Sequence, residues 1–411
     1  MAEITSYGIG LVDAKAAEKP KDSKGHHMKR EGFIFERIAC PANIRRAIHK
    51  AAIGKTDNRL VRNVLEHEDE AVVRVREILL SGFKPSPYKR SIIFDGANKK
   101  QREILKPRFY PDQIIHWALI MQIESAIMRG MYDWSCCSIP GRGQSRCKQG
   151  VERWLKGDPE NTKYCLKIDI RKFYPSVDNQ ILKAAFRRII KDARTLSLID
   201  AIIDSTKGLN IGNYTSQWFA NFYLQPVDHF IKEKLRHTVR NGKRGSKPSD
   251  AIIYYARYND DMVMFGRNKK ALRNARDALF AYLQDKMHLT VKDNWQLFLV
   301  TCVKRRRDGT TYKAGRDVDF LGFRMNHECT TLRRKLSLRM ARRARKIYKK
   351  KRVPNYADCA AMISYCGWLK HSDSHNFYTK RIAPYVNIEA MKGIVSNEAR
   401  AKQRQAAAIH R

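Results

Sequence analysis

A short run of residues, Tyr258-Asn259-Asp260-Asp261, constrains the fold of this chain more than any other feature of its sequence. Apolar and aromatic runs flank it at 252–256 and 262–265. Two such runs around a short polar break are typical of a β-hairpin, although Asn-Asp-Asp is not the preferred Asn-Gly turn. Side chains alternate along a strand, so Asp260 and Asp261 are expected to point to different sides. An isolated acidic turn on the surface would show the same pattern, so a functional reading needs a further carboxylate.

That carboxylate is Asp169, at the end of another predicted strand. An apolar run from Tyr164 leads into it, and Phe-Tyr-Pro-Ser at 173–176 ends the strand before a helix that starts near Asp178. Oxygen ligands of this kind suit Mg²⁺, which keeps waters and substrate phosphates in its remaining positions. Two such ions roughly 3.5–4 Å apart can activate a hydroxyl and stabilise a leaving pyrophosphate. The acidic residues therefore predict two-metal phosphoryl transfer with Mg²⁺, for which Mn²⁺ could substitute.

The order of motifs along the chain resembles that of the palm of a reverse transcriptase. The motifs are Asp169 with Phe173-Tyr174, Ile211-Gly212-Asn213-Tyr214-Thr215-Ser216-Gln217, Tyr258-Asn259-Asp260-Asp261 and Phe320-Leu321-Gly322-Phe323. The motif at 211–217 is similar to that of enzymes from bacterial and phage diversity-generating retroelements. Retroviral, retron and group II intron enzymes usually carry a Pro-Gln-Gly type motif there. The resemblance covers most of the chain and implies an α+β fold of the right-hand polymerase type, with fingers, a palm built on an antiparallel sheet, and a helical thumb.

The same comparison, with the local sequence patterns, predicts the order of subdomains. We expect a flexible basic arm at 1–30, a helical extension at 31–84, fingers at 85–165, a palm intermixed with fingers at 166–328, a helical thumb at 329–390 and a basic tail at 391–411. Within these regions, periodicity predicts a helix at 111–134 and another at 356–369, and a short strand at 289–292.

The resemblance also implies roles for individual residues. Asp169, Asp260 and Asp261 would be catalytic and would hold the metal ions together with Ile170. Residues implied to contact the incoming dNTP are Arg102, Lys100, Tyr174, Phe173, Ile211, Gly212 and Lys292. Residues implied to contact template or primer are Ser216, Gln217, Tyr258, Asn259, Leu321 and Gly322. A planar guanidinium and a compact ammonium both suit phosphate oxygens, although a solvated basic turn would also contain them.

Three of these assignments carry a physical consequence. Tyr174 aligns with the residue that excludes a ribose 2′-OH by steric clash, whereas Phe173 is expected in the core. Ile211 stands where many reverse transcriptases have a Gln that touches the incoming nucleotide, so checking of the nascent base pair could loosen and fidelity could be low. Gly322 would let the backbone approach the primer terminus.

Charge supports a nucleic-acid partner independently of the motifs. The chain has 81 Lys and Arg against 41 Asp and Glu, a formal charge of +40. Such an excess is more than solubility requires, and polyanion binding is its usual purpose. A basic structural protein would share the charge, but 43% hydrophobic residues provide for a large core. Basic residues interleaved with apolar ones at 333–352 predict a helix that grips a duplex by its phosphates, or else a solvated helical face.

Cysteine usage and hydropathy bear on the compartment. Nine Cys are scattered without a CxxC pair, which is typical of reduced thiols in the cytoplasm of a bacterium or phage-infected cell. A zinc set of Cys359, Cys366, His371 and His375 is disfavoured because the spacing of the two cysteines is too loose. No apolar run approaches the roughly 20 residues of a membrane span.

The sequence therefore predicts an RNA-directed DNA polymerase that makes error-prone cDNA from a structured template RNA. Its expected partners are dNTPs, the RNA/cDNA duplex and a small basic accessory protein. Two alternatives remain open. One is an antiphage defence reverse transcriptase that uses a non-coding RNA, because Asn259 departs from the usual Met, Ala or Val and Asn210 replaces a common Pro. The other is an RNA-binding protein that retains the palm without synthesis.

Overall fold

A computed structural model describes residues 30–95, 100–235, 237–238, 249–350 and 353–409 of the chain. The arm expected at 1–30 lies outside these residues, apart from Arg30. The fold is α+β, with antiparallel sheets and one mixed sheet. Two compact units divide the chain: unit 1 contains Met1–Gly130 and Asn179–Thr215, and unit 2 contains Met131–Asp178 and Ser216–Arg411. No helix in the described ranges is both long and apolar enough to cross a membrane.

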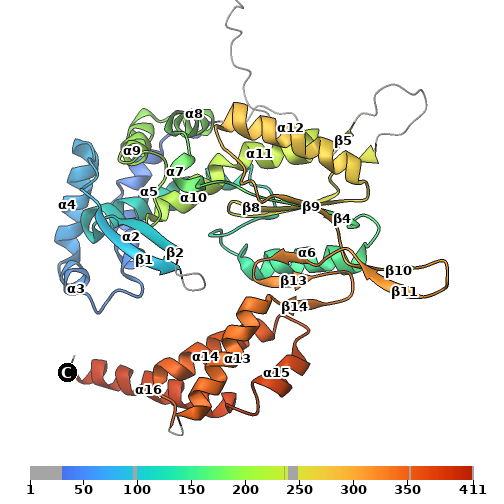
Figure 1. The fold of residues 1–411 in the computed structure, drawn as a ribbon. Coiled ribbons are helices and arrows are strands. Elements are labelled where there is room, and N and C mark those ends of the chain that lie inside the picture. Colours follow the sequence, from blue (N-terminus) through green and yellow to red (C-terminus); the bar gives the residue numbers. More distant parts are fainter. Residues whose placement is uncertain (1–29, 96–99, 236, 239–248, 351–352, 410–411) are drawn as a thin grey trace, which may run out of the picture. The chain divides into compact units, whose positions relative to one another are not determined.

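Unit 1 combines helices with one β-hairpin (Figure 1). Its elements are α1 (Ile34–Ile38), α2 (Pro41–Ala52), α3 (Arg59–Glu66), α4 (Glu68–Ser81), β1 (Lys89–Asp95), β2 (Lys100–Lys106), a π-helical turn (Phe109–Gln113), α5 (Ile114–Met128), α8 (Asn179–Ile189) and α9 (Ala193–Asp204). The helix expected at 111–134 is shorter in the structure. It ends before Gly130, a residue with low helix propensity.

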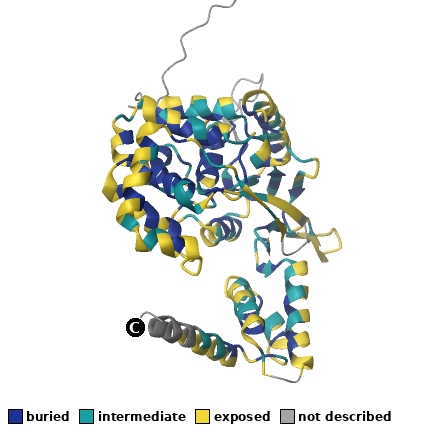
Figure 2. Cartoon of the chain, turned by 90° about the vertical axis from the view of Figure 1, so that its left-hand side faces the viewer, coloured by how far each residue is buried: buried dark blue, intermediate teal, exposed yellow. Residues whose placement is uncertain are grey.

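The core of unit 1 forms where α2 packs against α5. Pro41 begins α2, where its missing N–H has no helical partner to lose. The apolar residues of α2 recur at helical spacing and are buried: Ile44, Ala47, Ile48 and Ala51. The Asn43 side chain crosses to α5 and donates to the Ala118 carbonyl at 3.1 Å, which fixes how the two helices meet. Helices at the surface of this unit, such as α2, are buried on one side and exposed on the other (Figure 2), whereas α5 is buried or half-buried at all but one residue.

Unit 2 contains the larger sheet and the C-terminal helices. Its elements are β3 (Ser135–Cys136), α6 (Gln144–Gly157), β4 (Tyr164–Asp169), α7 (Phe173–Ser176), most of α10 (Tyr214–Tyr223), α11 (Gln225–His229), a π-helical turn (Phe230–Lys234), β5 (His237–Thr238), β6 (Ser249–Asp250), β7 (Tyr254–Tyr258), β8 (Asp261–Gly266), α12 (Lys269–Met287), β9 (Gln296–Leu299), β10 (Cys302–Arg305), β11 (Thr311–Ala314), β12 (Val318–Phe320), β13 (Phe323–Met325), β14 (Thr330–Leu332), α13 (Arg334–Lys349), α14 (Tyr356–Leu369), α15 (His375–Arg381) and α16 (Ile388–Ile409).

The central sheet of unit 2 has the strand order β3-β7-β8-β4-β9, and only the β3–β7 pair is parallel. Figure 1 shows α12 on one side of this sheet and α6 on the other. Both faces of the central strands are therefore covered, and β8 is buried at every residue after Asp261. An apolar run of this kind is what a strand covered on both faces requires.

The segment 289–292 does not form the strand expected from its sequence. Only Val291 makes a single bridge, to Ile170, and the chain then turns at Asp293 and Asn294. Asp and Asn favour turns because their side chains bond to nearby backbone groups.

The C-terminal helices share one core with the central sheet. Met340, Ala344 and Ile347 of α13 are buried in the same cluster as Val263 and Phe265 of β8. The helix at 356–369 has the predicted bounds, as α14. The region 391–411, expected as a tail, is helical as far as Ile409 because α16 begins at Ile388.

Candidate active site

The tight turn between β7 and β8, here called the Asn259 turn, consists of Asn259 and Asp260. Tyr258 pairs with Asp261 as the last rung of the ladder, so only two residues form the loop. Asn259 has φ +57°, and the preferred two-residue hairpin turns need a positive φ at that first loop position. Asn tolerates this conformation better than most residues with a Cβ. The backbone therefore explains an Asn at position 259, and the hairpin predicted from the sequence is present.

Strand register brings the carboxylates together. β4 runs antiparallel to β8, and Asp169 lies directly opposite Asp261. Directly opposite residues have their Cβ atoms about 4.5–5.5 Å apart on the same face. Asp260 follows from the adjacent turn, and its Oδ1 accepts a hydrogen bond from Asn259 Nδ2 at 3.0 Å. Three acidic side chains from two distant segments thus lie at one end of the sheet.

Proximity and burial change the proton affinity of these groups. Burial raises the pKa of Asp261 from 3.8 to about 7; Lys167 opposes this shift, and Asp169 and Asp260 add to it. Burial likewise raises the pKa of Asp260 from 3.8 to about 6, with Asp169 as the next cause. The folded protein therefore holds negative charges together at neutral pH against their repulsion.

Two lysines partly neutralise this charge. The Lys292 ammonium donates a hydrogen bond to Asp169 Oδ2, and the Lys292 backbone N–H donates to the Asp169 carbonyl at 2.9 Å. Lys167 Nζ lies 3.7 Å from Asp261 Oδ2 and donates to the Asp319 carbonyl at 2.5 Å. Lys292, predicted to contact the incoming dNTP, thus lies beside the three carboxylates.

The donor set fits a divalent cation. Asp169 Oδ1 and Asp261 Oδ1 are buried and accept no hydrogen bond. Leaving such atoms unsatisfied costs free energy, and a cation would bind both and relieve the repulsion. Across the described residues no three acidic, His or Cys side chains are arranged to hold a metal ion. Lys292 occupies the second oxygen of Asp169. Ile170 has a buried apolar side chain, so only its carbonyl could contribute.

Aromatic residues line the Asn259 turn. Burial raises the pKa of the Tyr174 phenol well above its usual value, with Cys137 and Asp260 as further causes, while a hydrogen bond from Asn259 opposes the shift. Phe173 is buried and meets Tyr174 edge to face, with ring centroids 5.6 Å apart. Burial also raises the pKa of Tyr258 to about 12. The structure therefore places Tyr174 next to the carboxylates and Phe173 beneath it.

A fully buried ion pair lies beside the turn. Arg257 and Asp228 are each 0% exposed. Arg257 Nε donates to Asp228 Oδ1 at 2.8 Å, and its Nη2 donates to Oδ2 at 2.6 Å. Ser135 and Tyr255 also donate to this carboxylate, at 2.6 and 2.7 Å. Burial opposes the charge on Arg257, but Asp228 more than offsets it, so the pKa of Arg257 is raised.

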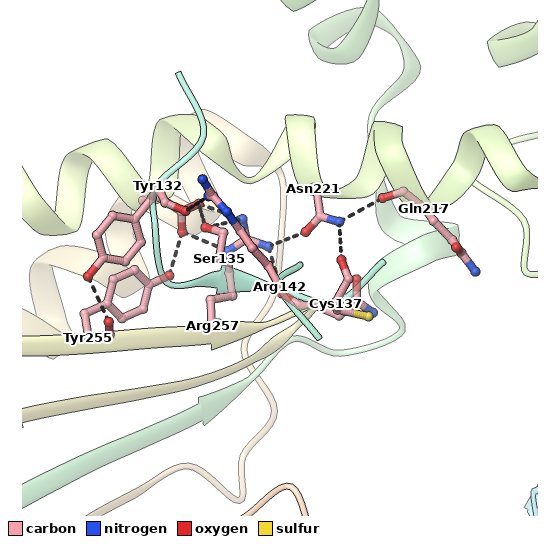
Figure 3. A network of polar contacts seen from close by, with 10 residues as sticks. Tyr132, Ser135, Cys137, Arg142, Gln217, Asn221, Tyr255 and Arg257 are labelled. Atoms are coloured by element: carbon pink, nitrogen blue, oxygen red, sulfur yellow. Dashed lines mark hydrogen bonds and ion pairs between the residues drawn. The ribbon is translucent and has the colours of Figure 1, made fainter. Parts of the chain in front are cut away.

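The remaining donor of this guanidinium reaches the turn itself. Arg257 Nη1 donates to the Asn259 carbonyl and to Asn221 Oδ1, both at 3.1 Å. Asn221 Nδ2 in turn donates to the Cys137 carbonyl at 3.0 Å and to the Gln217 carbonyl at 3.1 Å (Figure 3). The side chains of Arg257 and Asn221 therefore connect the turn with helix α10 and with Cys137, the residue after β3. Sequence reasoning missed this network, although an Arg inside the apolar strand 254–258 signals a buried charge that needs a partner.

The motif at 320–323, which contains the predicted template or primer contacts Leu321 and Gly322, forms a second tight turn, between β12 and β13. Leu321 and Gly322 have φ +51° and +85°, the signs of a type I′ turn. Gly322 is predicted to let the backbone approach a primer; within the chain, a Cβ there would lie 2.7 Å from the indole of Trp368. Helix α14 thus occupies the space beside this glycine. Gln144 Nε2 also donates to the Leu321 carbonyl at 2.9 Å.

Other predicted contact residues belong to unit 1. The Ile211 carbonyl accepts from the Leu105 N–H at 3.1 Å, and a Cβ on Gly212 would lie 2.6 Å from the Leu105 carbonyl oxygen. The motif at 211–213 therefore packs closely on β2, whose exposed residues include Arg102. The side chain of Lys100 lies outside the described residues.

The template motif continues into helix α10. Ser216 is 3% exposed, whereas Gln217 is exposed. Of these two side chains, Gln217 is the one that is accessible from solvent.

Comparison with known proteins gives distant similarity. No protein-family model matches the chain. It is 24% identical over 226 residues to protein YkfC of Escherichia coli strain K12, a match covering 48% of this chain and 59% of that protein. It is 21% identical over 189 residues to the uncharacterized mitochondrial protein ymf11 of Marchantia polymorpha, covering 44% of this chain and 23% of that protein. The chain thus spans less than two thirds of either relative.

Replacing Asp228 by Ala should destabilise unit 2 strongly. The change leaves the Arg257 charge buried without its partner, which typically costs about 3–5 kcal/mol. Chemical unfolding followed by circular dichroism measures the loss. The matched control is Glu160→Ala, which breaks the exposed Arg267–Glu160 pair and should cost less than about 1 kcal/mol. Equal losses in the two variants would contradict the structural role of the buried pair.

Replacing Asp261 by Asn should stabilise the metal-free protein at neutral pH. Because its folded pKa lies above 3.8, the folded state binds more protons than the unfolded state between about pH 4 and 7, so stability falls as pH rises through that window. The variant should lose most of this dependence. Added Mg²⁺ should raise the melting temperature of the parent at pH 8 more than at pH 6, and that of the variant little. A parent protein indifferent to Mg²⁺ at both pH values would argue against a cation site.

Proposed function

We propose that this chain is an RNA-directed DNA polymerase that copies a structured template RNA by magnesium-dependent nucleotidyl transfer. One observation carries the proposal: Asp169 stands opposite Asp261 in register, with Asp260 in the adjoining two-residue turn. A solvated acidic turn would need neither the buried, unpartnered oxygens nor the raised pKa values of this cluster. Strongly shifted groups of this kind are typical of functional sites.

The side chains have separate tasks in this mechanism. Asp169 and Asp261 would hold Mg²⁺, which when bound lowers the pKa of an attacking hydroxyl and stabilises charge on phosphate oxygens. Lys292, on the Asp169 carboxylate, keeps a proton-bearing ammonium beside the reacting groups. Tyr174 presents its ring next to Asn259 and Asp260, where it would meet the sugar of an incoming nucleotide.

The basic surface supports a polyanionic substrate. Helix α13 buries Met340, Ala344 and Ile347 on one side. Its exposed positions include Arg334, Arg342, Arg345, Lys346 and Lys349. A helix fixed in this way by its apolar face can present cations to the phosphates of an RNA/cDNA duplex.

The proposal extends to the biological setting. The 211–217 motif supports a diversity-generating retroelement, and Ile211 in that motif supports low fidelity, since an apolar side chain cannot hydrogen-bond to the nascent pair. A small basic accessory protein and a cytoplasmic location belong to the same proposal.

Primer extension by the purified full chain tests the activity. An RNA template annealed to a DNA primer, with dNTPs and Mg²⁺, should yield cDNA of the template's sequence. Asp260→Ala and Asp261→Ala should each reduce the yield by at least about a thousandfold, because each removes one of the three clustered carboxylates that are proposed to act with Mg²⁺. Asp285→Ala, an exposed position on α12, is the matched control and should extend like the parent. A parent protein that binds the primed RNA but extends it on no template would leave an RNA-binding protein instead.

Tyr174→Ala should weaken discrimination against ribonucleotides. Removal of the ring beside the Asn259 turn opens space for a 2′-OH, so incorporation of rNTPs relative to dNTPs should rise by about tenfold or more. Competition between the two nucleotide sets in primer extension measures the ratio. Tyr174→Phe retains the ring and should keep the parental ratio. Unchanged sugar selectivity in the Ala variant would remove the assignment.

A further inference from the structure

A β-hairpin of unit 2 extends away from the edge strand β9 (Figure 1). Among the strands that the structure describes, β10 and β11 pair only with each other, from Cys302 opposite Ala314 to Arg305 opposite Thr311. We call residues 302–314 the β10–β11 arm. Its loop is well formed: the Arg306 N–H donates to the Thr310 carbonyl at 2.7 Å, and Asp308 Oδ1 accepts from the Thr310 N–H at 2.9 Å.

The base of the arm is fixed to the central sheet. The Thr301 N–H donates to the Arg316 carbonyl at 3.1 Å, and the Arg316 N–H donates to the Leu299 carbonyl at 3.0 Å. Gly315 has φ +83°, and a Cβ there would lie 2.5 Å from the Leu299 carbonyl oxygen. The close packing at the base therefore holds the arm in a defined direction from β9.

Packing within the chain does not account for the arm's composition. Every residue from 303 to 313 is exposed. The exposed residues include Val303 at 53% and Tyr312 at 40%. An isolated two-stranded hairpin is only marginally stable in water. Its basic residues are Lys304, Arg305, Arg306, Arg307 and Lys313, against the single acid Asp308. This concentration of positive charge is what attracts a polyanion.

One face of the arm combines these charges with an aromatic ring. Lys304 is paired with Tyr312 across the strands, so their side chains share a face. The Arg306 guanidinium lies over the Tyr312 ring, 5.1 Å from its centroid. Single-stranded nucleic acids are bound by such a pattern, in which an exposed ring stacks on a base while flanking cations contact phosphates. A duplex keeps its bases stacked inside and cannot use the ring in the same way.

We propose that the β10–β11 arm is a binding site for a single-stranded polynucleotide, with Tyr312 as the stacking platform and Lys304, Arg306 and Arg307 as phosphate contacts. The occupant is single-stranded nucleic acid rather than a protein strand, because the arm carries cations along both strands and its loop. The site adds to the proposed polymerase function. Its test measures binding alone, so a β10–β11 arm that does not bind single strands and a chain that does not synthesise DNA are separate results.

Fluorescence anisotropy of the full chain with a labelled, unstructured strand of about 20 nucleotides tests the proposal. The measurement is made once with RNA and once with DNA of the same sequence. The triple variant Lys304→Ala, Arg306→Ala, Arg307→Ala should bind about tenfold more weakly. The slope of log affinity against log salt should fall by about 2, since each phosphate contact contributes about 0.7 on single strands. A loss confined to RNA identifies RNA as the occupant, and an equal loss on DNA identifies either strand.

Two further variants separate stacking from charge. Tyr312→Ala should weaken single-strand binding by about fivefold or more and leave duplex binding unchanged, whereas Tyr312→Phe should bind like the parent. The matched charge control is Lys269→Ala, Lys270→Ala, Arg273→Ala on the exposed side of α12. Circular dichroism confirms that each variant is folded. The proposal is overturned if the arm variant loses no more affinity than the α12 control, or if Tyr312→Ala binds single strands like the parent.

Discussion

The buried pair of Arg257 and Asp228 is the interaction on which the candidate site depends. Two charges without solvent contact are costly unless every donor and acceptor is satisfied. Here the carboxylate also accepts from Ser135 and Tyr255, and the guanidinium reaches Asn221 and the Asn259 carbonyl. The groups that satisfy the pair come from β3, β7, α10 and α11, so the pair connects these four elements. The pair therefore specifies where the Asn259 turn lies, whatever its net contribution to stability.

Strand register then decides which side chains meet. A shift of one residue between β4 and β8 would move Asp169 away from Asp261 and turn Lys167 to the opposite face. The apolar runs that lead into these residues are covered on both faces, so such a shift would place each core side chain in space that fits a different residue. Packing of the sheet between α12 and α6 thus holds the carboxylates of Asp169 and Asp261 together. The lysines beside these carboxylates reduce the repulsion that remains.

The parts of the site that follow a local rule could be predicted from the sequence. The apolar runs on both sides of Asn259-Asp260 predicted the hairpin, and the apolar run ending at Asp169 predicted β4. Pairwise partners in space follow no local rule: nothing in the order of residues connects Asp228 with Arg257, or Trp368 with Gly322. The prediction of a strand at 289–292 was wrong because β9 forms the ladder with β4, and this segment adds only the bridge between Val291 and Ile170 before the chain turns. Roles such as that of Arg102 rest on resemblance and are not decided by local structure.

The contact between Gly322 and Trp368 restricts how a chain of this kind can diverge. The indole fills the volume that any side chain at position 322 would need, and the positive φ there already disfavours other residues. A larger residue in the turn would require a smaller one on α14, so the two positions should change together among descendants of this sequence. Positions 322 and 368 are far apart in the chain, yet they would be inherited as a single unit of variation.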